Sequence, residues 1–342
     1  MAQSRSRRMQ GLDLLQKTGI FEIAHKLSPN LLTVLNYHRI DDPFRMGFDT
    51  FRSNVSATPS DFARQMDYVA QRYNVISGTE LADCVKKRRE LPPRAAMITF
   101  DDGYYDNYSI AYPILKARNL PAIIFLATDY IGEKKPFYWD LIAFCFHHTK
   151  RDQAEFPHLG SQSWSDETSR NKAMQNWIAV LKKLSDAEKQ DLVEKLPAIL
   201  DVSVPQDAFA NMMMSWAQAK ELSENGIEMG GHTASHPILT RISPEEASTE
   251  LVRSKQRIEE AIGKRVMSFA YPNGQSNDFN VDLITRVRDA GFDIAFTLLS
   301  GPTRYSTVLK NPFAIRRIFL THKDSFSRFT AKLAGISRIK PI

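Results

Sequence analysis

Short apolar stretches alternate with helical patterns along most of the chain, and this alternation limits the fold more than any other feature. Helix signals stand between consecutive stretches. For example, Ser-Pro-Glu-Glu at 243–246 has the pattern of a capping box with proline at the first helical position, and the helix it starts should end at Gly263. The alternation predicts parallel strands, right-handed crossovers and hence a distorted (β/α) barrel. The predicted strands are 31–35, 73–76, 95–100, 122–127, 227–230, 266–270, 294–298 and 314–320.

The length of the chain agrees with one sizeable domain. Its 342 residues are 43% hydrophobic and 25% charged, enough to bury a large core. Between Trp139 and Trp216 the strand–helix rhythm gives way to helical patterns. We therefore expect an N-terminal helical segment at 1–30, a barrel at 31–335, and within it a helical insertion at 139–216 that could cap the site.

Two of the predicted strands end on side chains that bind metals. One runs into Asp101 and Asp102, followed by Gly103, and the other into His232 and His236. If the strands are parallel, both groups project from the same rim of the barrel. One aspartate and two histidines leave open positions on a metal such as Zn²⁺, and the second aspartate stays free for proton transfer. Each block alone is weak, because Asp-Gly pairs often close turns and histidines four apart also arise by chance.

These blocks resemble the first two motifs of the polysaccharide deacetylases, the NodB-like family 4 carbohydrate esterases. Thr-Phe-Asp-Asp-Gly at 99–103 matches the first motif in full and His-Thr-Ala-Ser-His at 232–236 the second, while Phe-Ala-Tyr-Pro-Asn-Gly at 269–274 resembles the third. The likeness runs from about residue 35 to residue 319. It implies an α/β fold, a distorted (β/α)7-type barrel with the helical insertion on the catalytic rim.

The resemblance also implies a role for each motif residue. Asp101 would be the general base, whereas Asp102, His232 and His236 would hold a divalent metal. Zinc is the default metal, and cobalt and nickel suit the same ligands. The backbone N–H of Asn273 would donate to the oxyanion that forms during hydrolysis.

The third motif departs from the commonest form of the family. Ala270 stands where an arginine usually orients the catalytic aspartate, so the partner of Asp101 is open. An Ala-Tyr-Pro version resembles the deacetylases of poly-N-acetylglucosamine biofilm systems and of exopolysaccharide clusters. Within this motif we take Tyr271 as a candidate substrate contact.

In that subgroup the general-acid histidine lies before the first motif, in a Tyr-His segment. Tyr37 and His38 fit this segment, so we expect His38 to be the acid. An imidazolium with a pKa near neutrality can protonate a departing amine. The alternative acid is His322, in a Leu-Thr-His segment after the last predicted strand. We prefer His38 because its segment is the fuller match.

Trp139 and Asp140, at the start of the insertion, are further candidates for substrate contacts. Aromatic faces stack on sugar rings, and the insertion leaves the barrel on the catalytic rim. The alternative is that the aromatic residues of the insertion fill its own small core. The sequence does not decide between these two interpretations.

These features predict a metal-dependent N-deacetylase that removes acetyl from an N-acetylated amino sugar of a bacterial polysaccharide or glycolipid and releases acetate. The partner would be an N-acetylated glycan or a lipid-linked sugar. Two alternatives stay open. One is a metal hydrolase of another C–N bond, as in cyclic imides and ureides, and the other is a catalytically lapsed glycan-binding protein. The long insertion and the Tyr-His segment favour a glycan substrate, and the intact motif residues argue against lapsed catalysis.

Charge and compartment are less informative. The net charge is +6, but the basic residues are dispersed and no nucleic-acid-binding motif accompanies them, so we expect no nucleic-acid partner. The N-terminus lacks an apolar signal segment, which favours a cytoplasmic protein. Segment 12–27 could form an amphipathic helix that makes peripheral contact with the inner membrane face. A helix packed against the barrel is the better alternative.

Overall fold

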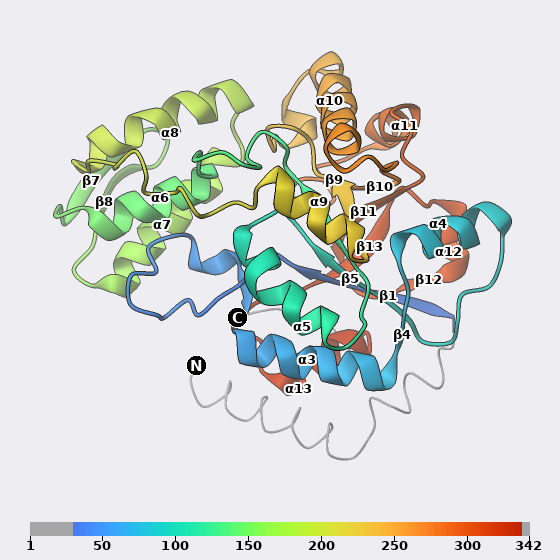
Figure 1. The fold of residues 1–342 in the computed structure, drawn as a ribbon. Coiled ribbons are helices and arrows are strands. Elements are labelled where there is room, and N and C mark those ends of the chain that lie inside the picture. Colours follow the sequence, from blue (N-terminus) through green and yellow to red (C-terminus); the bar gives the residue numbers. More distant parts are fainter. Residues whose placement is uncertain (1–29, 337–342) are drawn as a thin grey trace.

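Seven parallel strands close into a barrel in the computed structural model, which describes residues 30–336 (Figure 1). Strand β1 pairs with β5 on one side and with β13 on the other, and these two pairings close the ring. The ring follows chain order, which confirms the expected α/β barrel with seven strands. Its strands are β1 (Leu31–Tyr37), β5 (Ala95–Phe100), β6 (Ala122–Leu126), β9 (Ile227–Gly231), β10 (Ser268–Ala270), β11 (Ile294–Ser300) and β13 (Ile315–Phe319).

The predicted strand at 73–76 does not join this ring. It forms the short strand β4 (Asn74–Val75), which pairs with the first two residues of β5. Further along β5, Thr99 and Phe100 pair with β6, so the ring position beside β5 is already taken. The remaining short strands are β2 (Arg39–Ile40), β3 (Val55–Ala57) and β12 (Thr303–Arg304), the last antiparallel to β1.

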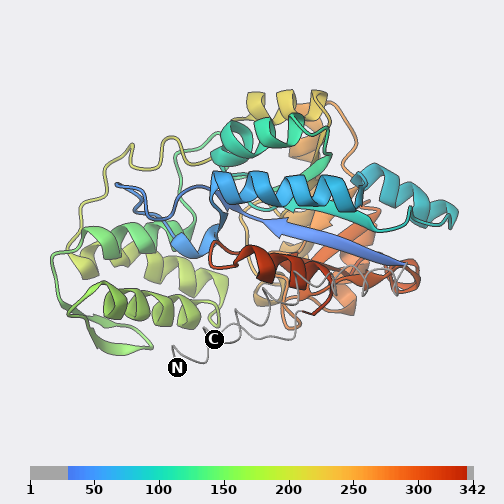
Figure 2. The ribbon, with the colours of Figure 1, turned by 90° about the horizontal axis from the view of Figure 1, so that it is seen from below.

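Helices between the strands cover the outside of the barrel, and α3 and α13 lie side by side in both views (Figures 1 and 2). The helix predicted from residue 243 is α10, with the expected capping box at Ser243 and with Gly263 in a left-handed conformation at its end. These helices are α3 (Pro59–Arg72), α4 (Gly78–Lys87), α5 (Tyr112–Lys116), α9 (Trp216–Glu224), α10 (Pro244–Ile262), α11 (Val281–Asp289), α12 (Tyr305–Lys310) and α13 (Phe326–Leu333).

Alternate side chains of the barrel strands fall into two separate apolar clusters. Val34 and Met97 belong to one cluster, whereas their chain neighbours Leu35 and Ile98 belong to the other, together with Phe62 of helix α3. This division follows from the two-residue period of a strand, because successive side chains point to opposite faces. Burial on both faces explains why the strands appear in the sequence as continuous apolar runs.

The expected insertion forms a helical layer beside the barrel (Figures 1 and 2). Trp164 and Trp177 are buried within it, and the ring of Trp164 lies 5.5 Å from that of Phe146. Its elements are α6 (Tyr138–His148), β7 (Gln153–Phe156), β8 (Gly160–Ser163), α7 (Glu167–Leu181) and α8 (Asp186–Leu200).

The N-terminal helical segment expected at 1–30, including the amphipathic pattern at 12–27, falls almost entirely outside the residues that the structure describes. Its packing therefore stays a prediction. Within residues 30–336, no helix combines the length and the apolar character needed to cross a bilayer.

Candidate functional site

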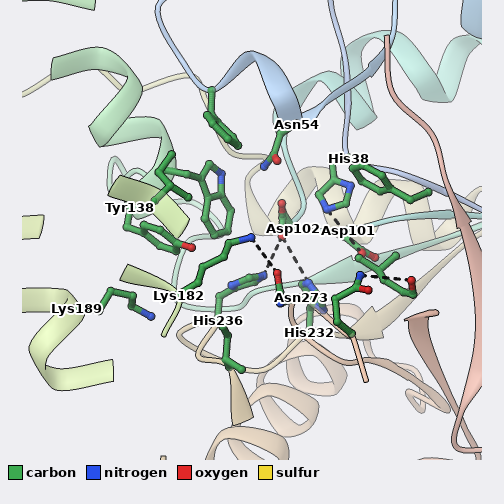
Figure 3. Close-up of a pocket in the computed structure, with 17 residues that line it drawn as sticks. His38, Asn54, Asp101, Asp102, Tyr138, Lys182, Lys189, His232, His236 and Asn273 are labelled. Atoms are coloured by element: carbon green, nitrogen blue, oxygen red, sulfur yellow. Dashed lines mark hydrogen bonds and ion pairs between the residues drawn. The ribbon is translucent and has the colours of Figure 1, made fainter. Parts of the chain in front are cut away.

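A cavity of about 260 Å³ lies between the strand ends and the insertion (Figure 3). Its volume is slightly below the roughly 300–1,000 Å³ that is typical of small-molecule sites. Titratable side chains from three strand ends line it: His38 after β1, Asp101 and Asp102 after β5, and His232 with His236 after β9. Parallel strands bring them together because their carboxyl ends all meet at one rim.

Asp102, His232 and His236 form a cluster with the ligand types of a metal site. One potential ligand atom from each residue lies within 4.8 Å of the others. The Nε2 atoms of His232 and His236 are 3.6 and 3.4 Å from Oδ1 of Asp102. Within residues 30–336, no other group of three or more histidine, cysteine or carboxylate side chains has this arrangement.

The electrostatics of the cluster suit a cation. Both carboxylate oxygens of Asp102 are buried and accept no hydrogen bond from the described residues. Burial, with the nearby charge of Asp101, raises the pKa of Asp102 well above its ordinary value. Burial also lowers the pKa of His232 and of His236, which favours the neutral imidazoles that bind metals. A divalent cation would compensate the charge of Asp102, so the three residues fit a metal ion.

A hydrogen bond to the third motif orients His232. Its Nδ1 lies 2.7 Å from the carbonyl oxygen of Ala270 and must donate to it, because a carbonyl oxygen accepts only. The lone pair of Nε2 is therefore left for the side that faces Asp102. Ala270 lacks the arginine side chain common in the family, but its backbone fixes the tautomer of a potential metal ligand.

Glu250 of helix α10 holds the loop between the two histidines. Its carboxylate accepts hydrogen bonds from the backbone N–H groups of Ala234 and Ser235, each at 2.8 Å. It also accepts a hydrogen bond from the Ser235 hydroxyl at 3.0 Å. These contacts fix a loop in which Thr233 and His236 have left-handed backbone conformations, with φ of 64° and 61°.

Asp101 lies beside the cluster and is held by Arg317 of β13. The two Nη atoms of Arg317 donate to Oδ1 and Oδ2 of Asp101 at 2.6 and 2.8 Å. Asn36 of β1 donates to the same carboxylate at 2.9 Å. Burial alone would raise the pKa of Asp101, but the guanidinium outweighs it and holds this pKa well below its ordinary value. Arg317 thus orients Asp101, a role that Ala270 cannot fill at the position where the arginine usually stands.

His38 points at the same carboxylate. Its Nε2 lies 3.9 Å from Oδ2 of Asp101, and its ring packs edge-on against Phe319. Burial lowers the pKa of His38 to about 4, although the charge of Asp101 opposes this shift. The imidazole is therefore neutral at pH 7 before substrate binds.

Asn273 also lines the cavity, with φ of 61°. Its side chain is occupied, because Oδ1 accepts from Nζ of Lys182 at 2.9 Å and Nδ2 donates to Asp278 at 2.6 Å. Its backbone N–H donates no hydrogen bond within the described part of the chain. That donor is free for a ligand in the cavity.

Trp139 lines the cavity and contacts a potential metal ligand. Its ring lies edge-on to that of His236, with 5.0 Å between centroids. Its Nε1 donates to the hydroxyl of Tyr104 at 2.8 Å. The cavity wall at this point is therefore the aromatic ring of Trp139, which a hydrogen bond to Tyr104 holds in place.

Asp140 and Tyr271, the other candidate substrate contacts, do not line the cavity. Asp140 is fully buried, and its carboxylate accepts from the backbone N–H of Phe51 at 3.0 Å and from the hydroxyl of Tyr104 at 2.7 Å. Tyr271 is also fully buried, and its hydroxyl donates to the carbonyl of Phe313 at 3.1 Å. Both side chains serve the protein interior, so neither geometry fits a direct contact with substrate.

His322, the alternative acid, lies away from the cavity. Its Nδ1 is 3.0 Å from the carbonyl oxygen of Val55, and its ring packs edge-on against Phe44. It does not line the cavity that contains His38. Of the two candidate acids, His38 lies beside Asp101 and Asp102 in the cavity, and His322 does not.

Among the site residues that the sequence analysis did not single out are Arg317, Glu250 and Lys182. Arg317 had a signal, since a charged residue inside the apolar stretch 314–320 would need a buried partner. Glu250 and Lys182 had none, because each lies in a polar helical pattern that looks like a solvated surface.

Glu250→Ala should weaken metal binding about 10- to 100-fold, the usual effect of removing a side chain that orients metal ligands. The loop N–H groups would lose their acceptor, and His236 would no longer be held in its left-handed conformation. Competition with a chromophoric chelator measures the affinity. Glu245→Ala, an exposed position on the same helix, is the matched control. Equal affinities for the two variants would contradict the role given to Glu250.

Arg317→Met should lower the free energy of unfolding by about 3–5 kcal/mol, because it leaves the Asp101 carboxylate buried and unpaired. The double variant Asp101→Asn/Arg317→Met should recover part of this loss, since the uncompensated charge is gone. Urea unfolding of the metal-free proteins measures both effects. If the double variant is as unstable as the sum of the two single variants, the ion pair is not the source of the coupling.

The chain is similar in sequence to known proteins. YxkH of Bacillus subtilis strain 168, whose name assigns it provisionally to the polysaccharide deacetylases, is 19% identical over 309 residues, covering 90% of this chain and 78% of YxkH. The poly-beta-1,6-N-acetyl-D-glucosamine N-deacetylase of Staphylococcus aureus is 31% identical over 125 residues, 34% of this chain and 43% of that protein. The chain thus matches less than half of the staphylococcal enzyme.

The fold also has a solved counterpart. The Streptococcus pyogenes deacetylase PplD, in complex with acetate, superposes with a TM-score of 0.58 at 17% identity, covering 90% of this chain and 99% of PplD. The sequence model described as polysaccharide deacetylase matches residues 88–295. Because this match spans more than half of the chain and includes the strand-end aspartates and histidines, the chain belongs to the polysaccharide deacetylase family.

Proposed function

We propose that this protein is a metal-dependent N-deacetylase that removes acetyl from an N-acetylated amino sugar of a bacterial polysaccharide or glycolipid and releases acetate. One observation carries the proposal: the cluster of Asp102, His232 and His236 lies next to the Asp101 carboxylate that Arg317 keeps ionised. The staphylococcal relative, which acts on poly-N-acetylglucosamine, supports this substrate class.

The metal would be held by Asp102, His232 and His236, with zinc the default. When bound, such an ion supplies Lewis acidity toward water and an acyl oxygen. Asp101 accepts the proton of the attacking water. Because its pKa is low, Asp101 is a weak base. It can accept a proton readily only from a water molecule whose own pKa is lowered.

His38 protonates the departing sugar amine. It is neutral in the resting protein, so it must gain its proton during turnover. Asp101 is the nearest source, since its carboxylate lies 3.9 Å from Nε2 of His38. Arg317 favours the ionised form of Asp101, and this favours passing the proton from the carboxyl to the imidazole. The backbone N–H of Asn273 donates to the oxyanion.

Asp101→Asn should keep the metal and lower kcat about 10²- to 10⁴-fold, because the proton acceptor is gone while the ligands remain. Asp102→Ala should lose metal and activity together. Metal content and acetate release from N-acetylglucosamine oligomers, with chelated and zinc-reloaded protein, measure both. Normal turnover by Asp101→Asn would rule out its role as base. Stoichiometric metal without any acetate release by the wild type would point to a different C–N bond or to a lapsed binding protein.

His38→Gln should bind metal normally and lower kcat about 100-fold or more, because the amine leaves without its proton. His322→Ala is the matched control, and its activity should be close to that of the wild type, since His322 does not line the cavity. Acetate release and metal content are measured for both variants. A slower His322→Ala than His38→Gln would reverse the assignment of the acid.

A further inference from the structure

The insertion brings two lysines to the cavity: Lys182, just after α7, and Lys189, within α8 (Figure 3). Both line it together with Asp101 and Asp102. The proposed deacetylation uses neither lysine. Each ammonium is therefore either paired within the protein or available to a ligand.

Lys189 is paired. It is 5% exposed and forms an ion pair with Asp186, one turn earlier in the same helix. Its ammonium also lies 5.2 Å from the centre of the Tyr138 ring, on whose face a cation is attracted. The charge of Lys189 is therefore compensated inside the insertion.

Lys182 is not paired with a carboxylate. Its ammonium donates to Oδ1 of Asn273 at 2.9 Å, and it forms no ion pair with any carboxylate of residues 30–336. An ammonium has three donors, so two remain. The side chain stays accessible to solvent, and a ligand in the cavity can reach it.

Asp278 is the carboxylate whose charge acts most on Lys182, and it accepts hydrogen bonds from Nδ2 of Asn273 and from the backbone N–H of Gln275. Asp101 is neutralised by Arg317, and Asp102 is a ligand of the proposed metal. Lys182 also acts on the reacting groups: burial is the main cause of the low pKa of His38, and the positive charge of Lys182 adds to it. Lys182 thus places an ammonium, free of ion pairs within residues 30–336, next to the proposed site of hydrolysis.

We infer that the glycan carries an anionic group, a carboxylate or a phosphate ester, which Lys182 binds within this cavity. The inference rests on the proposed function, which places the N-acetyl group at the metal ligands. Lys182 contacts Asn273, whose backbone N–H would bind the acetyl oxygen. The anionic group therefore belongs to the same sugar or to its direct neighbour. Hydrogen bonds between an ammonium and an anionic oxygen are about twice as strong as neutral ones.

Turnover of three substrates tests the inference: an N-acetylglucosamine disaccharide, N-acetylglucosamine 1-phosphate, and N-acetylglucosamine linked to glucuronic acid. Zinc-loaded wild type should have a kcat/KM about 10-fold or more higher for at least one anionic substrate than for the neutral one, the size expected for a charged hydrogen bond. The preferred substrate tells phosphate from carboxylate. The preference should shrink as salt rises.

Lys182→Met should bring the ratio of anionic to neutral kcat/KM close to one. Lys183→Met is the matched control, because it removes the same charge one residue away, outside the cavity lining, and should keep the wild-type ratio. An unchanged ratio in Lys182→Met, or a wild type that does not prefer either anionic substrate, would overturn the inference.

Calorimetric binding to metal-free protein separates this inference from the proposed function. Chelation prevents the anion from binding the metal, so a tighter affinity for N-acetylglucosamine 1-phosphate or the glucuronate disaccharide than for N-acetylglucosamine should depend on Lys182. If that dependence appears while no substrate is hydrolysed, the anion site holds and the proposed deacetylase activity fails. If the substrates are hydrolysed but Lys182 affects neither the affinity nor the kcat/KM ratio, the proposed deacetylase activity holds and the anion site fails.

Discussion

A buried ion pair connects Arg317 of barrel strand β13 to Asp101, the proposed base of the reaction. Two charges inside a protein are costly to desolvate and persist only when their geometry is well matched. The two parallel hydrogen bonds from the guanidinium supply that match, and its remaining donors reach the carbonyl of Thr297 and the hydroxyl of Thr99. One side chain thus links β13, β11 and β5. The same ion pair, buried inside the barrel, keeps the Asp101 carboxylate ionised and fixes its orientation.

The candidate site depends on a second constraint, the backbone at the strand ends. Asp102, His236 and Asn273 all have positive φ, a conformation that costs a non-glycine residue about 1–3 kcal/mol. Such residues persist where their surroundings determine them, and the loop contacts of Glu250 are one example. All three residues line the cavity. The site is therefore set before a ligand arrives.

The sequence predicted what depends on local pattern and strand ends. Apolar runs located the seven barrel strands, but the run at 73–76 became β4 outside the ring, because pairing partners are decided by the whole sheet. Strand ends located the cluster of Asp102, His232 and His236, whose role as metal ligands stays a prediction. Neighbourhood in the chain did not reveal which way Asp140 and Tyr271 face, and both are buried. Arg317 is 216 residues from Asp101, a distance at which no local pattern indicates a contact.

The barrel and the insertion contribute different residues to the cavity. Every group assigned to hydrolysis lies at a barrel strand end, whereas Lys182 and Trp139 come from the insertion. Lys182 meets the barrel at Asn273 through a side-chain contact, so the oxyanion donor, a backbone N–H, is not consumed by it. A change in the insertion can therefore alter the charge offered to the substrate while every residue assigned to proton transfer stays in place. In the proposed function, substrate charge and proton transfer thus depend on different segments that share one cavity.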